Sequence, residues 1–136
     1  MEILLDKKYR QNLEKYADYM ETNKIKMLTI QDEKYPQKLR NLYDPPVVLY
    51  VAGNADILSN KGLAVIGSRA CTEYGKQVAK EFAYNLSKSN INIISGLAKG
   101  IDTYAHIGTI NASKPTIAVV GGGLDNIYPK ENLRTV

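Results

Sequence analysis

Three glycine-rich segments hold the residues of this sequence that could do chemistry. The first, Gly67-Ser68-Arg69, directly follows the apolar run Leu63–Ile66 and precedes a helical pattern. Backbone N–H groups, a hydroxyl and a guanidinium at one point are groups that bind a phosphate. The alternative for Arg69 is a salt bridge with Glu73 or Asp102. We favour the phosphate role, because a guanidinium after Gly-Ser at a strand end has few structural uses.

The second and third segments could extend the same site. Residues 95–102 form a loop of anion-binding type, in which glycines allow close backbone approach and a lysine supplies a point charge. Its candidate site residues are Ser95, Gly96, Lys99, Gly100 and Asp102. The third segment is Gly121-Gly122-Gly123, which either permits close approach to a ligand or merely turns the chain.

An acid–base pair is a further possibility, because Asp102 and His106 are four residues apart on one predicted helix. We favour a structural role for both: Asp102 caps the helix, and the imidazole packs and hydrogen-bonds near the sheet. No nucleophile accompanies them, since neither Ser68 nor Ser95 lies in a Gly-x-Ser-x-Gly elbow and Cys71 has no second histidine to activate it. No catalytic residue is therefore predicted.

The glycine spacing disfavours the common nucleotide cofactors. Gly67 does not begin a Gly-x-Gly-x-x-Gly pattern, and the chain contains no Gly-x-x-x-x-Gly-Lys-Ser/Thr loop. One cysteine and one histidine are too few for a metal site built from either residue type. We therefore predict no cofactor and no metal.

The elements that position these segments alternate between strands and helices. Strands are predicted over 63–66, 91–95 and 116–120, and helices over about 73–87, with Thr72 as its cap, and 101–111. The order βαβαβ predicts an α/β class, a Rossmann-like parallel sheet with helices on both faces. Ligands bind beyond the carboxyl ends of such strands, so the three glycine-rich segments should converge on one edge. Sheets of this type usually have two or three further strands, so we expect that this sheet is truncated after its third core strand.

The residues before this sheet form a smaller region. An amphipathic helix is predicted from Asp6 to Met20, a short strand over 25–30, a short helix from Pro36 to Leu42 and a strand over 47–52. Residues 54–62 are the best candidate linker to the sheet.

Charge and composition narrow the class of partner. The net charge of +4 comes entirely from residues 61–136, because residues 1–60 carry equal numbers of acidic and basic side chains. A polyanion partner and a plain basic surface are both consistent with this charge. A hydrophobic content of 44% excludes a disordered class, and no apolar run is long enough for a membrane span. A single cysteine fits a reducing cytoplasm.

Six short segments, in order over residues 28–136, carry a resemblance to a known family. They are Tyr35-Pro36-x-x-Leu39, Pro46-x-x-Leu49-Tyr50-x-x-Gly53-Asn54, Val65-Ile66-Gly67-Ser68-Arg69, Tyr74-Gly75, Ser95-Gly96-Leu97-Ala98-x-Gly100-Ile101-Asp102-x-x-Ala105-His106 and Gly121-Gly122-Gly123-Leu124-Asp125-x-x-Tyr128-Pro129-x-x-Asn132. Together they resemble the DNA-processing protein A family, also called DprA or Smf. The resemblance implies a helical N-terminal region over 1–27 and an extended Rossmann domain over 28–136, incomplete at its C-terminal side.

The resemblance also implies a function. Proteins of this type are not enzymes; they bind incoming single-stranded DNA during natural transformation (competence) and help load the RecA recombinase, as recombination mediators in the cytoplasm. A homodimer is implied if the later portion of the family's chain is present. No membrane is involved.

Residue by residue, the resemblance places the phosphate pocket on Gly67, Ser68 and Arg69, with residues 95–102 beside it. Lys99 joins them by its charge, and Lys130 is the next basic side chain expected at the same edge. Tyr74, Tyr104 and Tyr128 are candidates for base stacking, with core or rim packing equally open.

Two other interpretations stay open. One is a small-nucleotide-binding enzyme or sensor of the lysine-decarboxylase-like Rossmann superfamily. Members of that superfamily carry a Pro-Gly-Gly-x-Gly-Thr loop where this chain has Gly-Gly-Gly-Leu-Asp at 121–125, which favours DNA binding. The other is a truncated remnant that folds and binds nothing tightly.

Overall fold

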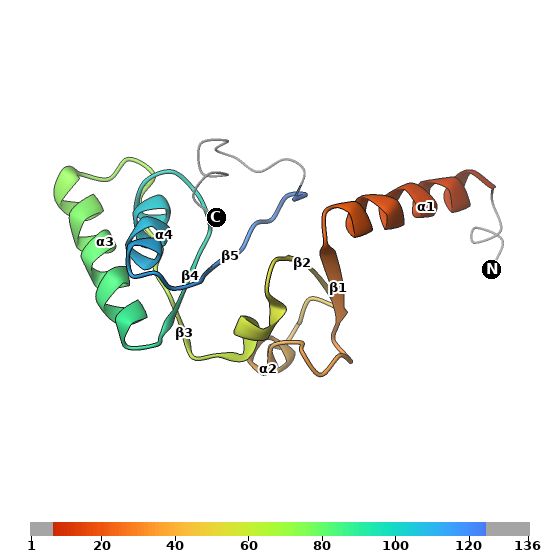
Figure 1. Cartoon of the computed structure of the whole chain (residues 1–136), viewed down its shortest axis with the longest axis horizontal. Coiled ribbons are helices and arrows are strands. Elements are labelled where there is room, and N and C mark those ends of the chain that lie inside the picture. The colour runs from red at the N-terminus through yellow and green to blue at the C-terminus, as the bar shows by residue number, and fades with distance from the viewer. Residues whose placement is uncertain (1–6, 125–136) are drawn as a thin grey trace. The chain divides into compact units, whose positions relative to one another are not determined.

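The computed structural model describes residues 7–124 and divides the chain into two compact units, Met1–Ser59 and Asn60–Val136 (Figure 1). The division falls inside the stretch 54–62 that the sequence predicts as a linker. The boundary predicted between residues 27 and 28 falls within a strand, β1 (Ile25–Thr29). The helix before that strand and the hairpin that contains it therefore belong to one unit.

The first unit is a helix followed by a two-stranded hairpin. It contains α1 (Lys7–Thr22), β1, α2 (Gln37–Arg40), β2 (Val48–Ala52) and the short 3-10 helix η2 (Ala55–Ser59). β1 and β2 pair antiparallel, with Met27 opposite Tyr50. The buried Tyr35 fills the interior of this unit, and its hydroxyl donates to the Pro46 carbonyl oxygen at 2.6 Å.

The second unit is a βαβαβ fold, as predicted. Its elements are β3 (Gly62–Ala64), α3 (Glu73–Lys88), β4 (Asn92–Ser95), α4 (Ile101–Asn111) and β5 (Thr116–Ala118). The strands are parallel in the order β3-β4-β5, with β4 in the centre. The α/β class with parallel strands and crossover helices is confirmed. α3 and α4 pack on each other and both contact β4, so they share one face of these strands. A helix on the opposite face stays a prediction.

A small apolar core lies between the central strand and the two helices. Ile93, Ala83 and Ala105 are fully buried, and Val65 and Leu86 pack against them. Small side chains dominate this core because the helices come very close to each other.

Gly108 permits that close approach of the helices. A Cβ on Gly108 would lie 2.2 Å from the Lys80 carbonyl oxygen of α3. The close approach at this position is therefore between α4 and α3. Beside it, the buried hydroxyl of Ser87 donates to Thr109 Oγ1 at 3.2 Å.

The strand before the first glycine-rich segment is largely exposed, although four apolar residues in a row are typical of a buried strand of a parallel sheet. Leu63 and Ile66 are 43% and 72% exposed, and the α3 residues Val78 and Phe82 are also exposed. Within residues 7–124, β3 has a neighbouring strand on one side only, and the helices cover one face. A run of four apolar residues predicts full burial only where both faces are covered. Across the described part of the chain, no helix has the length and apolar character needed to span a bilayer.

Candidate functional site

The loops that follow β3, β4 and β5 meet at one edge of the sheet, as the strand order requires. The Ile101 N–H donates to the Ser68 carbonyl oxygen at 3.2 Å, and the Val119 N–H donates to the Ser95 carbonyl oxygen at 2.8 Å. The structure therefore brings together the first two predicted segments, while Val119, two residues before the third segment, pairs with the end of β4. Ile101 was not among the predicted site residues, and an apolar residue whose backbone makes the contact leaves no signal in the sequence.

Asp102 does not cap its helix, and that prediction is wrong. Gly100 precedes α4 with φ +84°, and no side chain caps the helix there. The Asp102 carboxylate instead accepts the N–H of Gly67 through Oδ1 (3.3 Å) and the N–H of Gly96 through Oδ2 (3.1 Å). It is only 6% exposed. Because it lies in the first turn of α4, its charge is also stabilised by the helix dipole while it joins the two loops.

The glycines of the first two segments make room for this packing. A Cβ on Gly67 would lie 2.7 Å from Ile101 Cγ1, one on Gly96 would lie 2.8 Å from Asp102 Oδ2, and one on Gly100 would lie 2.2 Å from the Ser68 carbonyl oxygen. These glycines therefore serve contact between the loops. In the third segment, Gly121 and Gly122 are exposed, and a Cβ on either would meet no described atom within 4 Å.

The two predicted hydroxyl groups differ in accessibility. The Ser95 side chain is buried and donates to the Val65 carbonyl oxygen at 2.6 Å, so it ties β4 to the end of β3. Ser68 is exposed, and its Oγ accepts the Ala70 N–H at 3.1 Å. Of the two, Ser68 is the hydroxyl that a ligand can reach.

The positive charges lie on the outside of the joined loops. Arg69 is exposed and forms no ion pair within 4 Å with any residue in the range 7–124. The salt bridges considered for it do not form, because Glu73 pairs with Lys76 and Asp102 accepts the two backbone N–H groups. Lys99 is exposed on the second loop. Lys130 and Tyr128 lie outside the described residues.

His106 has a structural role, as predicted. It is fully buried, and its Nδ1 lies 2.8 Å from Thr116 Oγ1. The Thr116 hydroxyl donates to the Ile93 carbonyl oxygen at 2.9 Å, so the imidazole N–H donates to Thr116. Burial lowers the pKa of His106, an effect that the nearby Asp102 charge opposes. A buried neutral imidazole without access to solvent is not an acid–base catalyst for a bound ligand.

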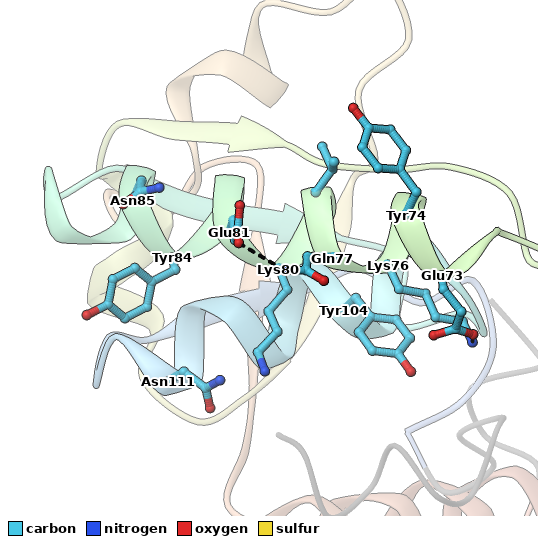
Figure 2. Close-up of a pocket in the computed structure, with 11 residues that line it drawn as sticks. Glu73, Tyr74, Lys76, Gln77, Lys80, Glu81, Tyr84, Asn85, Tyr104 and Asn111 are labelled. Atoms are coloured by element: carbon cyan, nitrogen blue, oxygen red, sulfur yellow. Dashed lines mark hydrogen bonds and ion pairs between the residues drawn. The ribbon is translucent and has the colours of Figure 1, made fainter.

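A broad groove on the outer surface of α3 and α4 was not found from the sequence. It has a volume of about 920 Å³ and contains two lysines and two glutamates (Figure 2). Glu73 pairs with Lys76, whose ammonium lies 5.6 Å from the centre of the Tyr104 ring. Gln77 donates to Glu81 at 3.3 Å. The charges of this groove cancel, so it has no net attraction for a polyanion. The exposed cations at the strand ends therefore remain the candidate for a phosphate site.

Comparison with known protein families gives a match that covers most of the chain. Residues 26–136 match the family model for DNA recombination-mediator protein A. Among curated proteins, DNA processing protein DprA of Streptococcus pneumoniae is 44% identical over 114 residues, which are 84% of this chain and 40% of that protein. Protein Smf of Borreliella burgdorferi is 39% identical over 117 residues, which are 86% of this chain and 37% of that protein.

Solved structures of this family have the same fold. DNA processing protein A from Streptococcus pneumoniae is similar with a TM-score of 0.76 and 41% identity, covering 87% of this chain and 42% of that one. A Helicobacter pylori DNA processing protein A, described for its unique single-stranded DNA binding mode, is similar with a TM-score of 0.70 and 33% identity. That match covers 82% of this chain and 49% of the other. The chain thus spans less than half the length of these relatives.

Proposed function

The chain belongs to the DNA recombination-mediator protein A family, and we propose that it binds single-stranded DNA at the strand-end loops of its second unit. The observation that carries the proposal is the exposed Arg69, which has no ion-pair partner among residues 7–124 and projects from loops held together by hydrogen bonds. A guanidinium fork fits the oxygens of a phosphodiester.

A second cation lies close to Arg69 in the chain's fold. A Cβ on Gly100, the residue after Lys99, would lie 2.8 Å from the Arg69 carbonyl oxygen. The backbones that bear the two exposed cations therefore run against each other. Two exposed cationic side chains on adjoining backbones suit the phosphates of one strand, and the exposed Ser68 lies in the same loop as Arg69. Gly121–Gly123 follow β5, which is parallel to β3 and β4.

The finer parts of the proposal rest on the family resemblance. They are a role without catalysis, assistance in loading RecA on DNA taken up in transformation, a cytoplasmic location, and a homodimer that needs the later portion of the family's chain. Binding of single-stranded DNA is further supported by the relative from Helicobacter pylori.

A small-nucleotide enzyme or sensor is the alternative use of the same loops. It finds less support, because His106 is buried and Ser95 donates to a backbone carbonyl. These two side chains offer such an enzyme neither a reachable base nor a reachable nucleophile.

The test compares ligands of increasing length. Fluorescence anisotropy with labelled oligothymidylates should show affinity that rises with length and falls linearly in log salt. Thymidine monophosphate should compete poorly. Equal affinity for the mononucleotide and the long oligonucleotide would favour the small-nucleotide alternative. Binding only by a version extended toward the relatives' full length would favour the truncated remnant.

Assistance in loading RecA is tested by a separate assay. RecA ATP hydrolysis on DNA covered by single-stranded DNA-binding protein should start sooner when the chain is added, and Arg69→Ala should remove the gain. An unchanged lag, with DNA binding intact, would limit the proposal to DNA binding.

A further inference from the structure

We infer that the Asp102 carboxylate occupies the place in this site where the phosphate of a mononucleotide would bind, so that the chain rejects small phosphate monoesters and leaves only its outer cations for a polymer. The inference concerns the ligand class of the proposed DNA site and rests on that proposal for the identity of the polymer.

Two backbone N–H groups lie just beyond the strand ends of the proposed site. Gly67 and Gly96 belong to the loops that follow two adjacent parallel strands, β3 and β4. In sheets of this type the N–H groups beyond the strand ends hold the phosphates of a bound nucleotide. Here both N–H groups donate to one carboxylate, with one oxygen for each, at 3.3 and 3.1 Å. An internal anion thus holds the donors that a ligand anion would use.

The carboxylate is built into the fold at this place. Asp102 is 6% exposed, and a Cβ on Gly96 would lie 2.8 Å from its Oδ2. A side chain at position 96 would therefore displace the carboxylate from its present place. The first turn of α4 supplies both the side chain and a dipole that favours its charge.

Two effects then exclude a small phosphate from the inner site. The two N–H donors are already satisfied, and a second anion beside a buried carboxylate meets repulsion in a medium of low dielectric. A phosphate monoester is left with the outer side chains alone. Each of those contacts is weak, so useful affinity requires several phosphates on one strand.

Asp102 is also a positioning residue. Its two hydrogen bonds hold the loop of Arg69 and the loop of Lys99 together, although residues 67 and 102 are 35 positions apart. The same carboxylate therefore closes the inner site and sets the separation of the outer cations.

The experiment asks whether an external anion can replace the carboxylate. Thermal unfolding of the 136-residue chain is followed in sodium phosphate and in sodium chloride at equal ionic strength, for the wild type, Asp102→Ala and Asp102→Asn. Thr109→Ala is the matched control, because this buried α4 side chain loses its hydrogen bonds to Ser87 and Ala105 without freeing the N–H groups of Gly67 and Gly96.

We expect Asp102→Ala to unfold at a lower temperature than the wild type in chloride and to recover part of that loss in phosphate. Thr109→Ala should be destabilised and show no such recovery. Asp102→Asn should show none either, because the amide still fills the space. Equal responses of Asp102→Ala and Thr109→Ala to phosphate would overturn the inference.

A measurement on the wild type keeps the inference testable if Asp102→Ala does not fold. In ¹H–¹⁵N spectra, the Gly67 and Gly96 amide signals should stay unmoved by inorganic phosphate and by thymidine monophosphate. Movement of both signals by either ligand would show an open inner site and would contradict the inference. Loss of oligonucleotide binding in Arg69→Ala tests the proposed function separately, since it does not depend on the inner site.

Discussion

Gly100 lies against the carbonyl group of Ser68 so closely that a Cβ on Gly100 would be 2.2 Å from the Ser68 oxygen. The N–H of the next residue, Ile101, donates to the same oxygen at 3.2 Å. This contact joins the loop after β3 to the start of α4. The candidate site therefore exists only when β3 and β4 are paired and α4 is docked on them.

Gly100→Ala should disrupt this contact. Gly100 has φ +84°, and the added methyl would overlap the Ser68 carbonyl, so we expect a loss of roughly 1–3 kcal/mol in the free energy of unfolding. Urea unfolding measures it. Gly121→Ala is the control, because its Cβ meets no described atom, and should change stability by less than about 0.5 kcal/mol. Equal effects of the two changes would contradict a tight contact at Gly100.

Arg69→Ala should weaken binding of single-stranded DNA at every sequence and reduce the slope of log affinity against log salt by about 1. Stability should stay within about 0.5 kcal/mol of the wild type, because Arg69 is exposed and has no ion-pair partner in the described range. Anisotropy titrations at several salt concentrations measure both. Lys88→Ala, an exposed lysine in the last turn of α3, is the matched charge control. The same loss in Lys88→Ala would mean that binding follows net charge alone.

Gly108→Ala should push α4 away from α3. The methyl would lie 2.2 Å from the Lys80 carbonyl oxygen, in backbone that cannot turn aside as a side chain could. Overpacking of this kind costs about 1–3 kcal/mol. Urea midpoints measure it, with the exposed Asn111→Ala on the same helix as control. A stability equal to that of Asn111→Ala would show that the helices can separate at little cost.

The stability of the chain should fall in mild acid because of His106. Burial lowers the pKa of its imidazole below the ordinary value of 6.5. The unfolded chain then binds a proton at a higher pH than the folded chain does, so the free energy of unfolding decreases as the pH falls below about 6.5. Urea unfolding between about pH 7.5 and pH 5 checks this. His106→Gln should remove the part of the slope due to this residue, and a slope identical to that of the wild type would assign the effect to other groups.

Much of the second unit follows from local sequence signals. Residues 101–111 form a helix with the predicted bounds. Thr72 caps α3 as predicted, its hydroxyl oxygen accepting the Gly75 N–H at 3.1 Å. Such features depend on residues within one or two turns of each other, which is why side-chain type and spacing predict them. The convergence of the three loops follows from strand order and chain direction.

The role of Asp102 could not be predicted from the residues near it in the sequence. Its partners are the N–H groups of Gly67 and Gly96, and only the pairing of β3 with β4 brings those groups to one carboxylate. Local spacing favours a helix cap at that position, because an aspartate near the start of a helix most often bonds to its own helix. The contact of Gly108 with Lys80 was missed for the same reason, since it depends on how two helices dock.

From the sequence alone follow the βαβαβ order, the family and the meeting of the loops after β3 and β4 at one edge of the sheet. Tertiary structure decided what the residues at that edge do. In the folded chain, Ser95 and Asp102 form hydrogen bonds with backbone groups, whereas Arg69 and Lys99 are exposed to solvent. The reason is physical: buried polar groups must find hydrogen-bond partners, and those partners lie on loops that are distant along the chain and adjacent only in the folded sheet.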